Sequence, residues 1–89
     1  MATLFARHSV TDYEAWRKVY DEYYPVRQRF GVTGEALFRS ADDPNDIMVM
    51  LDFATVERAR AFTNDAEFRT ALQKAGVTGA PTTWFTSRV

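Results

Sequence analysis

The sequence predicts a single α+β domain whose secondary-structure elements follow the order β-α-β-β-α-β. Two amphipathic helical stretches alternate with short segments rich in apolar and β-branched residues. The segment Gly-Val-Thr-Gly occurs twice, at 31–34 and 76–79, and each copy directly follows a helical stretch. The distance in sequence between the two helix starts, Thr11 and Thr55, is nearly the same as the distance between the two Gly-Val-Thr-Gly segments. We therefore expect one domain over residues 1–89, made of two similar halves in a ferredoxin-like arrangement, with a four-stranded antiparallel sheet and both helices on one face.

The first half is predicted to contain a strand and a helix. The segment Thr3–Val10 is rich in apolar and β-branched residues, which is typical of a strand. The residues Thr11–Glu14 have the spacing of a capping box, so a helix is expected to start there. Its apolar residues recur at steps of three and four as far as Phe30, and Gly31 is expected to end it. Pro25 removes a backbone donor inside this pattern, so we expect a kink or a break into two segments near Tyr24.

Three further segments are predicted to be strands. The second and third strands, Glu35–Ala41 and Ile47–Phe53, are joined by Asp42–Asn45, whose residue types tolerate tight turns. Thr82–Val89 is expected to be the fourth strand. Together with the first, these segments complete the predicted sheet.

The second helix lies between the third and fourth strands. Thr55 is a good N-cap residue, and Gly76 is expected to end the helix. Asn64 and Glu67 repeat the capping-box spacing inside it, so a second helical start is expected at Asn64.

The third strand is apolar on both faces, which predicts that both faces are covered. One face carries Ile47, Val49, Leu51 and Phe53, and the other carries Met48, Met50 and Asp52. Two helices in this topology cover one face of the sheet only. We expect a second copy of the chain to cover the other face, giving a homodimer through the sheet faces.

Composition and charge exclude several classes of protein. The 11 basic and 12 acidic residues leave a net charge of −1, so we expect no nucleic-acid partner. Without cysteine and with one histidine, the chain is not expected to hold a metal site. No segment approaches the ~20 apolar residues of a membrane span, so we expect no membrane partner and a cytoplasmic protein.

His8 and Asp52 are the candidate catalytic residues. His8 lies near the end of the first strand, and Asp52 lies near the end of the third, so the two are expected to be neighbours. A carboxylate would fix the tautomer of an imidazole whose ordinary pKa is ~6.5, which suits a general base. The alternative is a structural histidine bonded to backbone, with Asp52 paired to an arginine or a helix amide.

Arg7 competes with His8 for the uncovered face of the sheet. The two are adjacent in one strand, so only one of them faces that side, and the sequence does not say which. If His8 faces the helices, Arg7 lines the dimer interior and would anchor an anion there.

Five more residues are candidate substrate-binding residues. Tyr23 and Tyr24 abut Pro25, where a kink could turn a hydroxyl toward a pocket, although a tyrosine stripe is more often packing. Met48 and Met50 would line an adaptable hydrophobic site or a plain dimer interface. Trp84 and its neighbour Phe85 place one aromatic side chain on each face, so one of them is expected to line the interior.

The chain also resembles a known family. The resemblance rests on Arg7–Val10 with Asp12, Tyr13 and Trp16, on Pro25 and Gly31, on the turn Asp42–Asn45, on Phe53, Ala59 and Phe62, and on Gly76–Gly79 with Pro81. These residues resemble the small bacterial proteins called cyclases or antibiotic-biosynthesis-monooxygenase-like proteins, which belong to the dimeric α+β barrel superfamily. The resemblance implies a homodimer whose sheets form a barrel, and a cavity that takes an aromatic or polyketide-like molecule without metal, flavin or other cofactor. It also matches Asp52-Phe53 to an acidic and an aromatic residue that close the third strand in the monooxygenases.

Two functions follow as hypotheses. The first is a cofactor-independent enzyme, of cyclase or monooxygenase type, that abstracts a proton next to a carbonyl of an aromatic or polyketide-like substrate, with His8 as acid-base and Asp52 as its partner. The relatives' helix histidines are replaced here by residues such as Phe62 and Asn64, which weighs against a monooxygenase. The second hypothesis is a non-catalytic homodimer that binds a small apolar ligand or has a structural role.

Overall fold

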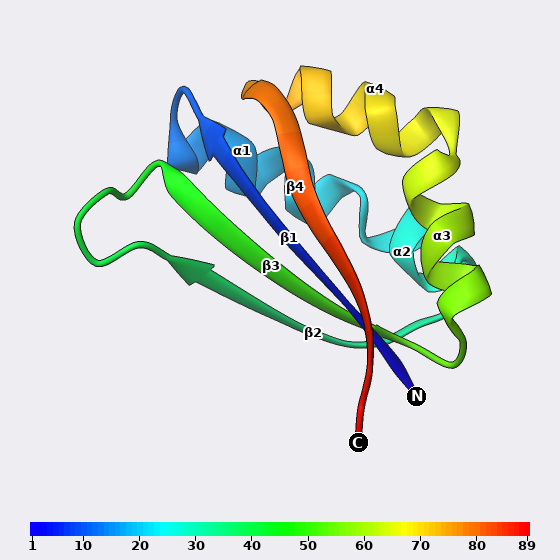
Figure 1. The fold of residues 1–89 in the computed structure, drawn as a ribbon. Coiled ribbons are helices and arrows are strands. Elements are labelled where there is room, and N and C mark those ends of the chain that lie inside the picture. The colour runs from blue at the N-terminus through cyan, green and yellow to red at the C-terminus, as the bar shows by residue number, and fades with distance from the viewer.

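The chain folds into one antiparallel sheet with a layer of helices on a single face (Figure 1). The computed structural model describes all residues, Met1 to Val89. Its elements are β1 (Ala2–Val10), α1 (Tyr13–Glu22), α2 (Tyr24–Arg29), β2 (Val32–Arg39), β3 (Asp46–Phe53), α3 (Val56–Asn64), α4 (Ala66–Lys74) and β4 (Val77–Ser87). The strand order is β2-β3-β1-β4 and all neighbours are antiparallel. The predicted ferredoxin-like α+β fold is confirmed.

The helix starts follow the predicted capping residues, with two shifts. The N-cap of α1 is Asp12, whose carboxylate accepts a hydrogen bond from the amide of Ala15 at 3.2 Å. Thr11, the predicted cap, lies one residue too early. Thr55 caps α3 as predicted, and the cap of α4 is Asp65, one residue after Asn64.

The predicted break in the first helix is confirmed, one residue before Tyr24: it lies at Tyr23, between α1 and α2. Pro25 lies in the first turn of α2, where its missing N–H has no intrahelical partner to lose. The break therefore interrupts the hydrogen-bond ladder at little cost while keeping the apolar stripe on one side.

Each Gly-Val-Thr-Gly segment ends a helix and begins a strand. Gly31 and Gly76 have φ of 85° and 77°, a left-handed conformation that favours glycine at the end of a helix. The next residues, Val32 and Val77, already belong to β2 and β4. Both strands therefore begin earlier than predicted, because no loop separates the helix end from the strand.

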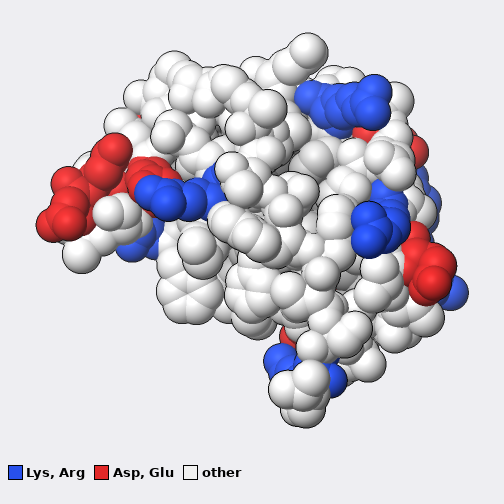
Figure 2. Space-filling model, in the orientation of Figure 1, with Lys and Arg blue, Asp and Glu red and all other residues white.

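The two faces of the sheet differ sharply. The face toward the helices carries the buried core, including Leu4, Ile47 and Phe53. The opposite face, here called the open face, carries exposed apolar side chains, with Phe38 54% and Trp84 45% exposed. Figure 2 shows that charged groups lie mainly toward the margins of this side and that its centre is uncharged. No helix of the chain is long and apolar enough to span a membrane.

Candidate functional site

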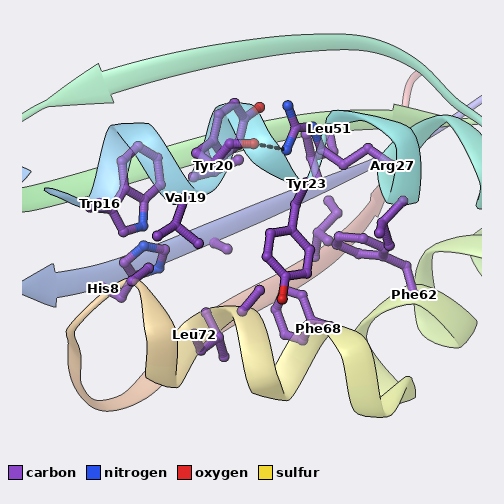
Figure 3. A pocket seen from close by; sticks show the side chains of 16 residues that line it. His8, Trp16, Val19, Tyr20, Tyr23, Arg27, Leu51, Phe62, Phe68 and Leu72 are labelled. Atoms are coloured by element: carbon purple, nitrogen blue, oxygen red, sulfur yellow. Dashed lines mark hydrogen bonds between the residues drawn. The ribbon is translucent and has the colours of Figure 1, made fainter. Parts of the chain in front are cut away.

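An apolar cavity lies between the sheet and all four helices. Its volume is about 80 Å³, and 14 of its 16 lining residues are hydrophobic. We call it the inner cavity. Figure 3 shows His8 and Trp16 at one end of it and Arg27 and Phe62 at the other. The cavity thus places one imidazole and one guanidinium in otherwise apolar surroundings.

His8 is the most unusual side chain of the inner cavity. It projects from β1 toward the helices, and only 7% of it is exposed. Neither Nδ1 nor Nε2 has a hydrogen-bond partner, although buried polar atoms are nearly always paired. Burial lowers the pKa of His8, and the charge of Asp46 offsets only part of this effect. The imidazole is therefore neutral near pH 7, with an unshared lone pair available to accept a proton.

The predicted His8–Asp52 pair is wrong. Because β1 and β3 are antiparallel, the end of β1 lies beside the start of β3, and His8 pairs with Ile47. Asp52 pairs with Thr3 at the other end of β1 and faces the open side. Its Oδ1 accepts a hydrogen bond from the hydroxyl of Thr3 at 2.6 Å. Asp52 therefore cannot orient the imidazole of His8 within one chain.

The open question of Arg7 and His8 is resolved by the burial of β1. His8 faces the helices, so Arg7 faces the open side, where it is exposed and donates two hydrogen bonds to Asp46, at 3.0 and 2.7 Å. This pairing lowers the pKa of Asp46. Arg7 thus has an acidic partner of its own and does not reach the inner cavity.

The predicted substrate-binding residues do not form one site. Met48, Met50 and Trp84 share the open face with Arg7 and Asp52, on the side of the sheet away from the inner cavity. These three residues therefore lie apart from His8, on the face where a dimer interface is expected.

Of the two tyrosines at the helix break, only Tyr23 lines the inner cavity. Figure 3 shows its ring extending toward Phe68 on α4. Tyr24 is 52% exposed and lies outside the cavity.

Arg27 is a site residue that the sequence analysis missed. Its side chain on α2 is only 4% exposed, and Nε donates to Oε2 of Glu35 at 2.9 Å. Nη1 donates to the backbone carbonyl of Tyr20 at 2.6 Å, and the guanidinium carbon lies 3.7 Å from the centre of the Tyr20 ring. The helical spacing of Tyr20, Tyr23 and Arg27 could have placed this arginine on the buried stripe.

Tyr20 is the second cavity residue with an unpaired polar atom. Its ring is held between Arg27 and the indole of Trp16, whose centroid lies 5.1 Å away. Its buried hydroxyl makes no hydrogen bond of good geometry, although the Glu35 carboxylate lies near it, and burial first and Glu35 second raise the pKa of Tyr20 well above its ordinary value. Every buried unpaired side-chain polar atom of the chain thus belongs to His8 or Tyr20, two residues of the same cavity.

The size of the inner cavity limits what it can hold. At about 80 Å³ it has roughly half the volume of a cavity of about 150 Å³ that binds benzene. A ligand of several fused rings would therefore need the helix layer to move. No group of three or more His, Cys, Asp or Glu side chains is placed to hold a metal ion.

Comparison with known proteins finds likeness in structure and none in sequence. No model of a protein family and no curated protein matches the chain. A candidate antibiotic biosynthesis monooxygenase from Bordetella bronchiseptica matches with a TM-score of 0.84 and 20% identity, over 99% of this chain and 96% of that one. A second candidate of this kind, from Nitrosomonas europaea, matches with a TM-score of 0.78 and 18% identity, over 100% and 99%.

The matches also include a characterised kind of enzyme. SnoaB from Streptomyces nogalater, a cofactor-independent oxygenase, matches with a TM-score of 0.80 and 15% identity, over 99% of this chain and 92% of that one. Identities this low establish the fold alone. The chain has the fold of the antibiotic biosynthesis monooxygenase-like proteins, as its sequence resemblance predicted.

Proposed function

We propose that the protein is a cofactor-independent enzyme that moves a proton at a carbon next to a carbonyl of a small aromatic or polyketide-like compound. The observation that carries the proposal is the neutral, unpartnered imidazole of His8 on the wall of an apolar cavity. The likeness to SnoaB, which is a cofactor-independent oxygenase, supports the same class of chemistry.

His8 is the acid-base in this proposal. The neutral imidazole accepts the proton from the substrate carbon, which leaves an enolate in a site from which water is excluded. The enolate then either attacks a second carbonyl of the same molecule, closing a ring, or reacts with dioxygen. The protonated His8 returns its proton to the product, so the imidazole is regenerated without a cofactor.

Arg27 would stabilise negative charge on a distal oxygen of a conjugated enolate. Arg27 lines the inner cavity, and its guanidinium donates to Glu35 and to the carbonyl of Tyr20, which leaves further N–H groups for a ligand oxygen. A fixed cation in low-dielectric surroundings favours the charge that develops as the proton leaves. Because His8 and Arg27 lie at opposite ends of the inner cavity, Arg27 would act on the far oxygen of a conjugated enolate and His8 on the carbon at the near end (Figure 3).

The open face is proposed to be covered by a second copy of the chain. Phe38, Met48 and Trp84 are exposed there, next to half-buried Phe5 and Met50. An apolar sheet face of this kind is typical of an interface between protein subunits. In this dimer, Met48, Met50 and Trp84 pack between the two sheets.

One observation favours a second candidate function. The inner cavity, at about half the volume of a cavity that binds benzene, is small, which suits a dimeric module that binds a small ligand without changing it.

The two candidates are separated by assaying turnover and binding with the same compounds. Monocyclic and tricyclic phenols and 1,3-diketones are incubated with the wild type, with His8→Gln and with Lys18→Gln, an exposed control on α1. Product formation and oxygen uptake should fall by about 100-fold or more in H8Q and stay unchanged in K18Q. Equal turnover in wild type and H8Q would refute the role of His8, and saturable binding without turnover would favour the binding module.

A further inference from the structure

A second hollow lies directly outside the inner cavity. It is a groove of about 410 Å³ between α3, α4 and β4, and we call it the outer groove. Phe68 and Leu72 line both the outer groove and the inner cavity. Both side chains are half-buried, and α4 has no fully buried residue. Two half-buried side chains on a helix without a fully buried residue therefore lie between the two spaces.

The outer groove is cationic, because arginines line it and acidic side chains do not. Arg60 and Arg69 line it, and none of its nine lining residues is acidic. Neither arginine takes part in an ion pair or a side-chain hydrogen bond. Ion pairs elsewhere in the chain engage Arg7, Arg17, Arg27, Arg29, Lys74 and Arg88. The guanidinium carbon of Arg60 lies 4.5 Å from the centre of the Phe85 ring, a stacking contact that leaves its N–H edges free.

The remaining lining residues divide into apolar and polar groups. Phe68, Leu72 and Phe85 are hydrophobic, Pro81 adds a nonpolar ring, and Thr63, Asn64 and Thr83 offer hydroxyl and amide groups. The volume lies within the ~300–1,000 Å³ typical of small-molecule sites. A ligand that matches this surface has an apolar body and one anionic end.

We propose that the outer groove binds the carboxylate end of an aromatic acid, whose ring packs on Phe68 and Phe85 at the entrance to the inner cavity. Resting on the proposed function, this names the substrate class as aromatic carboxylic acids. Planar guanidinium groups match the geometry of a carboxylate, and two of them without internal partners give a net attraction for one anion. The apolar residues favour an aromatic acid over free phosphate, which would leave them without a contact.

Rotation of Phe68 and Leu72 also relieves the size limit of the inner cavity. A ring too large for about 80 Å³ gains the volume of the outer groove once these side chains turn aside. The acid would then lie with its ring toward His8 and its carboxylate between Arg60 and Arg69.

The test is binding of 3-phenylpropanoate to the full chain, measured by calorimetry and by amide NMR shifts, with its uncharged amide and inorganic phosphate as comparison ligands. The acid should bind at least tenfold more tightly than the amide or phosphate, and shift the amides of Thr63, Asn64 and Thr83. Arg60→Gln and Arg69→Gln should each raise the dissociation constant of the acid by about fivefold, as expected for losing one exposed charge contact. Arg58 is an exposed arginine of α3 outside the groove, so Arg58→Gln should leave the affinity for the acid unchanged.

Several results would overturn the proposal. It would be contradicted if the amide or phosphate bound as tightly as the acid, or if R60Q and R69Q bound the acid as tightly as the wild type. It would also be contradicted if the acid showed no saturable binding at millimolar concentration. The His8→Gln variant separates this proposal from the proposed function. If H8Q binds the acid normally and the arginine variants bind it more weakly, the outer groove is a binding site for the acid. That conclusion holds whether or not turnover depends on His8.

Discussion

The imidazole of His8 lies against the indole of Trp16, with ring centroids 5.7 Å apart, and neither imidazole nitrogen has a hydrogen-bond partner. Apolar and aromatic packing therefore holds the ring in place without satisfying its polar atoms. This arrangement costs stability and leaves the basic nitrogen free, which is a common compromise at functional sites. It distinguishes His8 from a structural histidine bonded to backbone.

Replacing His8 by leucine should stabilise the fold. An unpaired buried polar group costs about 1–3 kcal/mol, and leucine fills a similar space without polar atoms, so His8→Leu should raise the free energy of unfolding by about 1 kcal/mol. Urea denaturation of wild type and variant measures this difference. A variant less stable than the wild type would mean that the imidazole makes a favourable polar contact.

The stability of the wild type should fall as the pH is lowered below about 6.5. Burial lowers the pKa of His8 in the folded chain, so the unfolded chain takes up its proton at a higher pH. Stability is therefore fully present above the unfolded pKa and is lost between that value and the lower folded pKa. Urea midpoints between pH 7.5 and 5 should decline in the wild type and decline less in His8→Leu. If the urea midpoints of the wild type and His8→Leu decline equally, a group other than His8 causes the pH dependence.

Arg27 should contribute more to stability than the exposed arginines. Arg27→Met removes the ion pair with Glu35, the hydrogen bond to the Tyr20 carbonyl and the stacking on the Tyr20 ring. We expect a loss of about 2 kcal/mol, below the range for fully buried pairs because Glu35 is one-third exposed. Arg17→Met breaks an exposed pair with Asp21 and should cost under about 0.5 kcal/mol. Equal losses in urea denaturation would contradict a structural role for Arg27.

The open face should mediate dimerisation. Trp84→Lys places a charge at an exposed apolar position on β4, so it should raise the dimer dissociation constant by at least tenfold in analytical ultracentrifugation. Gln73→Lys adds the same charge to an exposed position on α4 and should leave the dimer unchanged. A wild type that is monomeric at 100 µM would refute the interface.

Much of the fold is predictable because its signals are local. Thr55, Gly31 and Gly76 are specific to helix ends, and Pro25 marks the break between α1 and α2. The error at Thr11 arises because the next residue, Asp12, is an equally good cap.

The site was less predictable because it depends on long-range pairing. Arg7 and His8 are both polar, so alternation along β1 did not show which one faces the helices. His8 and Asp52 both lie toward the ends of their strands, but in antiparallel strands the end of one lies beside the start of the other, so the two residues are far apart. Arg27 was missed because a charged residue is rarely buried, and its partner Glu35 lies on a different element.

The central claim is that His8 is a neutral base on the wall of a ligand-accessible cavity, and NMR titration of its imidazole tests it most directly. The chain has one histidine, so the signals are unambiguous. We expect a pKa below the ordinary ~6.5 in the free protein, and a change in both the imidazole shifts and the pKa when a small aromatic carbonyl compound is added. An ordinary pKa together with shifts that no such compound alters would contradict the claim.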